Sequence, residues 1–234
     1  MKGSKYGNDS MFESWADNYI FIPLSNILIP LLYRLGLTPN KVTLLSTIST
    51  ILSSYFLYKN NGPKIFIYFY FIGYLLDCID GRFARRYNML SKLGMISDGV
   101  SDVVTNMMVL IAFILKFRNN SYIFFMLPLA LFLTYQLGVA YGLTEAIDCF
   151  NNNNHDNFYQ YKKELLKDFG NNYFEKLLSK TYIHINKLSY VSYKNKYKTF
   201  DKNKIKNMLK NTKEFGPGNY CIFGILIVLF LSNY

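Results

Sequence analysis

Four carboxylates stand at helical spacing within one short stretch, residues 76–102. Asp77 and Asp80 are three residues apart, and Asp98 and Asp102 are four residues apart. Side chains at these separations lie on the same face of a helix. Acidic residues joined to long apolar segments are costly unless a cation neutralises them. Because oxygen-only ligands suit hard divalent ions, this spacing predicts a site for Mg²⁺ or Mn²⁺.

The apolar segments on either side determine how the two pairs of acids meet. Residues 65–76 precede the first pair, and residues 103–115 follow the second. Two consecutive helices joined by a short linker run antiparallel, so the end of one faces the start of the next. All four carboxylates then meet near the membrane surface. Two metal ions bridged by such carboxylates are the usual clamp for displacement at a phosphoryl group.

Small and basic residues lie between the two acidic pairs. Gly81 and Ala84 leave room for a flat ligand to approach the helix backbone, and Arg82, Arg85 and Arg86 supply positive charge for phosphates. The chemistry predicted from the residues is therefore a metal-assisted reaction at a phosphate group.

The spacing of these residues also matches a known signature. The stretch reads D-x2-D-G-x2-A-R-x8-G-x3-D-x3-D, which resembles the signature of the CDP-alcohol phosphatidyltransferases, integral membrane enzymes of phospholipid synthesis. Residues 37–43 (LTPNKVT) resemble the Pro-Asn-x-x-Thr entry to the first membrane helix of that family. The resemblance extends from about Trp15 to Leu143.

The resemblance implies a role for each matching residue. The metal ligands would be Asp77, Asp80 and Asp98, with Asp102 as general base that also touches the second metal. The CDP moiety would be received by Gly81, Ala84 and Arg85, with Asn40 and Thr43 near the nucleotide. The implied reaction is attack of an alcohol on a CDP-linked lipid such as CDP-diacylglycerol, with release of CMP. The resemblance further implies a homodimer.

The remaining elements predict an all-α integral membrane protein, a helical bundle of about five to six transmembrane helices with an N-terminal interfacial helix. We expect four parts: a polar tail over 1–18, a membrane core over 19–143, a basic cytosolic insert over 144–216 and a C-terminal membrane segment over 217–234. The core comprises the interfacial helix and four spans, at 41–58, 65–84, 93–115 and 121–143.

Charge predicts how the chain lies in the membrane. The net charge is +11, and residues 144–215 contain fourteen Lys against eight acidic residues. Loops rich in Lys and Arg stay on the cytosolic side, which also puts the acidic stretch there. The insert is expected to form short amphipathic helices and to be attracted to anionic lipid. No motif for nucleic acid accompanies its Lys residues, so we expect no nucleic-acid partner.

Three other interpretations compete with an active transferase. A catalytically inactive relative would serve as a membrane scaffold or lipid-binding protein, although such a protein gains nothing from retaining four costly anions. A membrane prenyltransferase would need two Asp motifs on helices well apart in sequence, whereas both pairs here belong to one hairpin. An ion transporter would place its acids at the middle of the bilayer, whereas these lie beside a polar linker.

Overall fold

The protein is all-α in the part of the chain that its computed structural model describes, residues 13–59, 63–151, 166, 169–170, 172–184 and 201–233. The predicted all-α class is thereby confirmed. The elements are η2 (Asp17–Phe21), α1 (Ile22–Arg34), α2 (Pro39–Tyr58), α3 (Pro63–Arg86), α4 (Lys92–Phe117), α5 (Ile123–Asn151), α8 (Lys202–Thr212), η3 (Lys213–Phe215) and α9 (Pro217–Asn233). A further helix spans residues 173–184.

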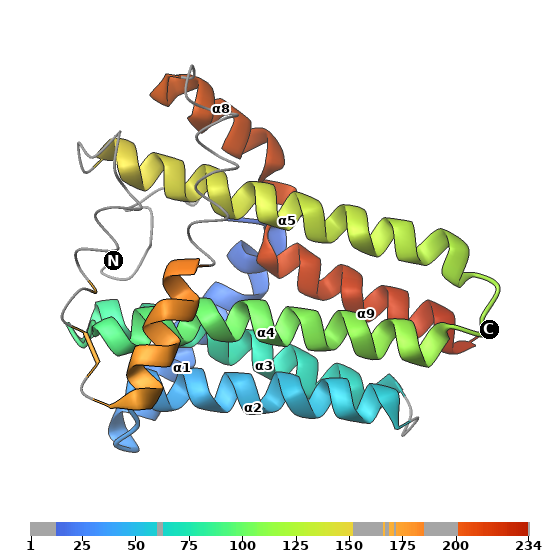
Figure 1. Cartoon of the computed structure of the whole chain (residues 1–234), viewed down its shortest axis with the longest axis horizontal. Helices are drawn as coiled ribbons and strands as arrows, with labels where there is room; N and C mark the ends of the chain where they lie inside the picture. Colours follow the sequence, from blue (N-terminus) through green and yellow to red (C-terminus); the bar gives the residue numbers. More distant parts are fainter. Residues whose placement is uncertain are drawn as a thin grey trace.

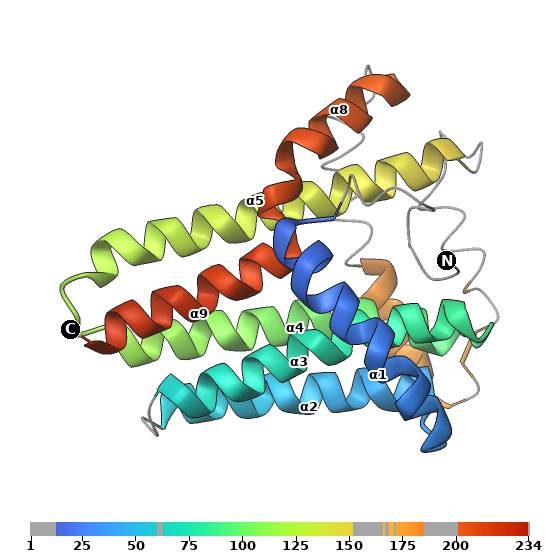
Figure 2. The ribbon, with the colours of Figure 1, turned by 180° about the vertical axis from the view of Figure 1, so that it is seen from behind.

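Five helices form the body of the bundle. The helices α2, α3, α4, α5 and α9 run side by side along the long axis of the molecule (Figure 1). Helix α1 crosses one end of the bundle and packs against α3 (Figure 2). The axes of α1 and α2 differ by 119°. The turn between them uses Gly36, whose positive φ of 71° suits glycine, and Pro39 at the start of α2.

The described helices are those of a membrane protein. Two helical stretches contain a segment long and apolar enough to cross a bilayer: α4 (Lys92–Phe117), and Asn203–Asn233, which joins α8 to α9 and whose apolar part is α9. A third span results if Asp17–Arg34 and Pro39–Tyr58 count as one broken segment. The predicted number of five to six membrane helices remains a prediction.

Small residues allow α2 and α3 to approach closely. The Ser46 hydroxyl donates a hydrogen bond of 2.8 Å to the carbonyl oxygen of Gly73. A Cβ atom at Gly73 would collide with the hydroxyl of Thr50 and lie 3.2 Å from its backbone nitrogen. Interfaces between membrane helices are commonly built from such residues, because small side chains let the backbones pack together.

A buried carboxylate joins the N-terminal segment to the bundle. Asp17 is 4% exposed. It accepts hydrogen bonds from the hydroxyls of Ser14 at 2.6 Å and Tyr74 at 2.7 Å, and from the backbone N–H of Gly218 at 3.2 Å. These donors come from three separate parts of the chain, so Asp17 holds the starts of η2 and α9 against α3.

We expect Gly73→Ala to lower the free energy of unfolding by about 1–3 kcal/mol, because the added methyl group overpacks the contact with Thr50. Thermal unfolding of the purified protein in detergent measures this loss. The matched control is Gly138→Ala on α5, where an added Cβ meets nothing within 4 Å. Equal stability of the two variants would contradict the close α2–α3 contact.

Candidate active site

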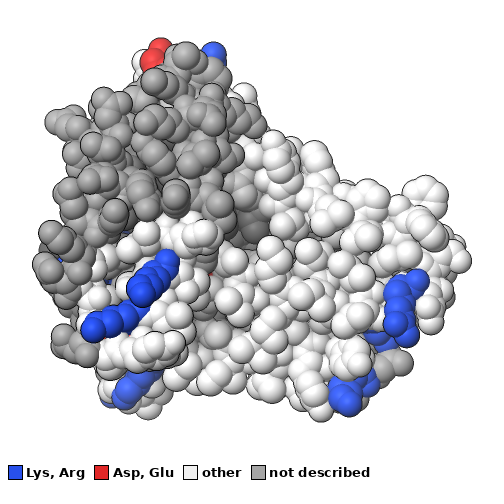
Figure 3. Space-filling model, viewed as in Figure 1, with Lys and Arg blue, Asp and Glu red and all other residues white. Residues whose placement is uncertain are grey.

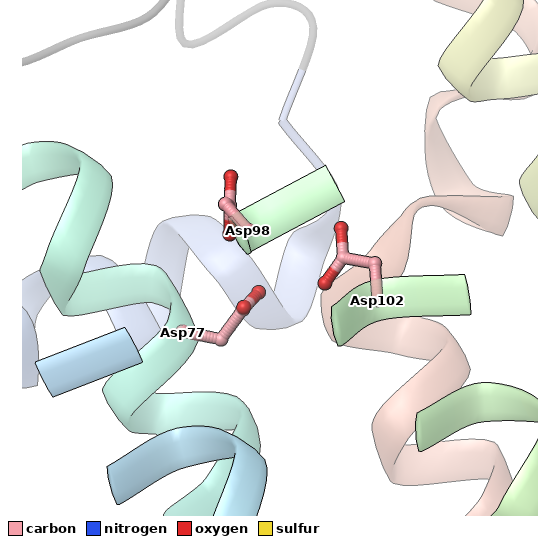
Figure 4. A group of neighbouring side chains, drawn as sticks. All are labelled: Asp77, Asp98 and Asp102. Carbon is pink, nitrogen blue, oxygen red and sulfur yellow. The ribbon is translucent and has the colours of Figure 1, made fainter. Parts of the chain in front are cut away.

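Three of the four predicted acids converge between two helices. Asp77 extends from α3, and Asp98 and Asp102 extend from α4 (Figure 4). One carboxylate oxygen from each lies within 4.8 Å of the others, and all three side chains are half-buried. Three oxygen ligands at this separation could hold a divalent cation.

The fourth acid lies next to this group and has a different partner. Asp80 is 4% exposed, and its carboxylate accepts a hydrogen bond of 2.5 Å from the hydroxyl of Thr43 on α2. The hydroxyl of Thr43 also lies 3.2 Å from the carbonyl oxygen of Pro39. The structure thus connects two residues that were predicted for different subsites, the metal and the nucleotide.

Local sequence explains how the two acid-bearing helices meet. After α3 ends, Asn88 takes a positive φ of 55°, a conformation that Asn tolerates better than most residues. Ser91 then caps α4, and its hydroxyl accepts a hydrogen bond of 3.0 Å from the backbone N–H of Gly94. The turn reverses the chain, so that the C-terminal part of α3 faces the N-terminal part of α4.

Asn40 lies against this turn. Its side-chain oxygen accepts a hydrogen bond of 3.2 Å from the hydroxyl of Ser91. The same oxygen lies 2.8 Å from the position that a Cβ of Gly94 would occupy, so any larger residue there would displace it. Asn40 therefore joins the start of α2 to the start of α4 beside the acids.

The residues predicted to receive the nucleotide lie on the last two turns of α3. The Arg85 guanidinium folds back over Gly81, with a nitrogen 3.4 Å from the position of a Cβ at that glycine. Ala84 is buried, at 8% exposure. Arg82 instead forms an ion pair of 3.3 Å with Glu13. Sequence reasoning missed Glu13, because 69 residues separate the partners and no local pattern connects them.

Two cavities among the described residues lie away from these acids. One of about 480 Å³ is at the opposite end of the bundle, beside Lys116 and Asn120. The other is apolar, between α3, α4, α5 and α9, and has Tyr70 and Tyr220 in its wall. The candidate site is thus recognised from the convergence of its charged side chains.

Comparison with known proteins shows that the segment carrying these residues is similar to one family. Residues 36–147 match the family model of the CDP-alcohol phosphatidyltransferases. This segment includes the four acids and the entry to α2, so the resemblance inferred from the signature is confirmed. The matched part of the chain is thus similar to the CDP-alcohol phosphatidyltransferases.

A curated relative matches over a shorter stretch. The chain is 42% identical over 64 residues to the CDP-diacylglycerol–inositol 3-phosphatidyltransferase of Saccharomyces cerevisiae. The matched stretch amounts to 27% of this chain and 28% of the yeast protein.

We expect Thr43→Val to weaken the binding of Mn²⁺ by about tenfold to a hundredfold, the usual effect of removing a hydrogen bond that orients a ligand carboxylate. Titration of the purified protein, followed by electron paramagnetic resonance of free Mn²⁺, measures the affinity. The control is Thr47→Val one turn further along α2, whose hydroxyl donates only to the carbonyl oxygen of Thr43. Unchanged Mn²⁺ affinity in the Thr43 variant would show that Asp80 is not a metal ligand.

Proposed function

We propose that the protein transfers a phosphatidyl group from CDP-diacylglycerol to a hydroxyl group of inositol and releases CMP. The observation that carries the proposal is the convergence of Asp77, Asp98 and Asp102 from two helices of the segment that matches the family. The name of the yeast relative supports CDP-diacylglycerol as the donor and inositol as the acceptor.

The acids suit a divalent cation. The donor set consists of carboxylate oxygens, which favours Mg²⁺ or Mn²⁺ over softer metals. Asp77, Asp80 and Asp98 would be ligands, and Asp102 would touch a second ion. When bound, a pair of such ions neutralises the diphosphate and stabilises the oxygen that leaves with CMP.

Asp102 is the proposed general base. The acceptor hydroxyl oxygen forms a bond to the phosphorus that carries diacylglycerol. The bond from this phosphorus to the bridging oxygen breaks, and that oxygen departs as part of CMP. Asp102 accepts the proton of the attacking hydroxyl. Asp98 lies one helical turn earlier on the same face, where as a metal ligand it would keep the cation that neutralises the diphosphate close to this base.

The nucleotide would lie along the end of α3. Gly81 presents no side chain, and the Arg85 guanidinium over it offers planar donors for phosphate oxygens. Ala84 keeps the next turn narrow, and Asn40 and Thr43 border the same region from α2. We infer that these five residues receive the CDP moiety.

The placement of the site in the cell follows from charge. The fourteen Lys of residues 144–215 favour the cytosolic side, and the helix of residues 173–184 within this segment packs against the turn of α4 that carries Asp98 and Asp102. We therefore propose a multi-pass membrane protein with its active site facing the cytosol. The homodimer remains a prediction from the family resemblance.

Specific observations argue against two of the competing interpretations. A scaffold would have no use for three carboxylates within 4.8 Å of one another, since their repulsion opposes folding. A prenyltransferase needs a second acidic cluster, and across the described ranges only this one group of acids has the spacing of a metal site.

We expect Asp102→Asn to lower CMP release by at least about a hundredfold, because the amide cannot accept the hydroxyl proton. The variant should stay folded and still bind Mn²⁺ through the other acids. The assay follows labelled CMP released from CDP-diacylglycerol in the presence of Mg²⁺.

The control for this variant is Asp201→Asn, which changes the N-cap of α8 far along the chain from the acids. It should retain full turnover. Normal turnover by the Asp102 variant would show that Asp102 is not the general base.

The acceptor is tested with a panel of alcohols. Labelled CDP-diacylglycerol is offered with inositol, inositol phosphate, serine, glycerol phosphate or phosphatidylglycerol, and CDP-choline or CDP-ethanolamine with diacylglycerol forms a separate arm. We expect a lipid product with inositol, abolished by a chelator. Product only with another alcohol would overturn the acceptor, and no product in any arm would favour the scaffold.

A further inference from the structure

The helix of residues 173–184 contacts the turn of α4 that carries the second pair of acids. It crosses α4 at the end of the bundle where the acids lie (Figure 1). Tyr182 is 6% exposed and packs with Ile96 of α4. A ring carbon of Tyr182 lies only 2.7 Å from the position of a Cβ at Gly99, the residue that follows Asp98. The helix is thus anchored beside the metal ligands.

The opposite side of this helix is exposed and apolar. Tyr173 is 83% exposed, Phe174 64% and Leu177 48%. At about 100° per residue, Tyr173 points away from Tyr182, and Leu177 and Phe174 continue the same side of the helix. Packing against α4 therefore does not account for these three side chains. An apolar strip of this kind indicates a further contact surface.

Two Lys residues form a strip beside the apolar one. Lys176 and Lys180 are four residues apart, exposed, and share one side of the helix next to Tyr173. Lys side chains flanking an apolar strip that contains aromatic rings are typical of helices that lie in a membrane interface. The positive charge suits the anionic headgroups of phospholipids.

The position of the helix agrees with this partner. One face of the molecule has a broad band without charged side chains, and Lys and Arg side chains gather at both ends of the band (Figure 3). The helix of residues 173–184 lies at one end of this band and crosses the direction of α4. Since α4 is a candidate membrane span, a helix that crosses it beside its first turns has the direction expected of a helix lying along the bilayer surface.

We propose that residues 173–184 form an interfacial helix that docks its outer face on a bilayer surface containing anionic phospholipid. Tyr173, Phe174 and Leu177 enter the boundary between headgroups and acyl chains, and Lys176 and Lys180 bind the anionic headgroups. The inner face, through Tyr182 against Gly99, holds the acid-bearing turn of α4 at that depth. The inference rests on the membrane placement of α4 and not on the proposed reaction.

A fluorescent reporter tests the docking directly. The protein contains a single Trp, so Trp15→Phe combined with Phe174→Trp places the only indole on the outer face of the helix. The protein is reconstituted in vesicles of phosphatidylcholine with or without phosphatidylserine. We expect lipids brominated on their acyl chains to quench the indole several-fold more than aqueous iodide does, with stronger lipid quenching when phosphatidylserine is present.

Matched variants separate the helix from the rest of the basic segment. Asn207→Trp in the same Trp15→Phe background reports on an exposed polar position of α8 and should be quenched by iodide instead. Lys176→Glu with Lys180→Glu should abolish the effect of phosphatidylserine. The pair Lys206→Glu and Lys210→Glu, with the same spacing on α8, should preserve it. Leu177→Trp is a second reporter on the apolar strip.

The opposite results would overturn the proposal. Quenching by iodide and not by lipid would show a solvated helix, and protection from both would show that protein, such as a second copy of the chain, covers the strip. Equal quenching in neutral and anionic vesicles would remove the role of the two Lys residues. Because none of these measurements requires turnover, a failure here leaves the proposed reaction untouched, and an inactive protein leaves the docking testable.

Discussion

The mutual repulsion of like-charged carboxylates is the constraint on which the site depends. Oxygen atoms of Asp77, Asp98 and Asp102 lie within 4.8 Å of one another. At about 5 Å and an effective dielectric constant near 20, each pair of full negative charges repels by roughly 3 kcal/mol. A chain that brings three such groups together beside apolar helices, with Asp80 buried next to them, must offset that repulsion. Bound divalent cations would offset it and, in the proposed reaction, would also supply the charge that a diphosphate substrate requires.

The surrounding helices hold the acids in place through contacts that depend on small or polar residues. Gly73 lets α3 lie directly against α2, and this close approach brings Thr43 within hydrogen-bonding distance of Asp80. The Ser91 cap and its hydrogen bond to Asn40 fix the start of α4 against α2. Helix α2 carries none of the acids, yet it positions both of the helices that do. Asn40 and Thr43 of α2 therefore lie beside the signature residues of α3 and α4.

The local part of this arrangement could be predicted from the sequence. Spacings of three and four residues placed each acidic pair on one helical face, and a short linker between apolar segments predicted an antiparallel hairpin. The contact between Thr43 and Asp80 joins residues 37 positions apart, and no local pattern reveals it. The same is true of Tyr182 and Gly99, because the register of a helix packed across another is set by side-chain shape. The predicted five to six membrane helices remain a prediction, because α2 and α3 mix apolar residues with Ser, Thr and Asp residues.

The surroundings of helix α4 differ between its start, which contacts other protein segments, and its later turns, which are more exposed. This difference relates the candidate site to the membrane. Near its start, Gly94 faces Asn40 and Gly99 faces Tyr182, so that protein side chains approach the backbone closely on two different sides. Further along, Met107 and Ile111 are more than half exposed. Large apolar side chains exposed on a membrane helix suit contact with lipid, whereas glycine beside a buried ring suits contact with protein. The acid-bearing part of α4 is therefore held by α2 and the helix of residues 173–184, while further along one side of α4 exposes large apolar side chains. The proposed reaction between a lipid-linked diphosphate and a water-soluble alcohol would require a site at such a boundary, because each substrate would have to reach the same carboxylates from a different solvent.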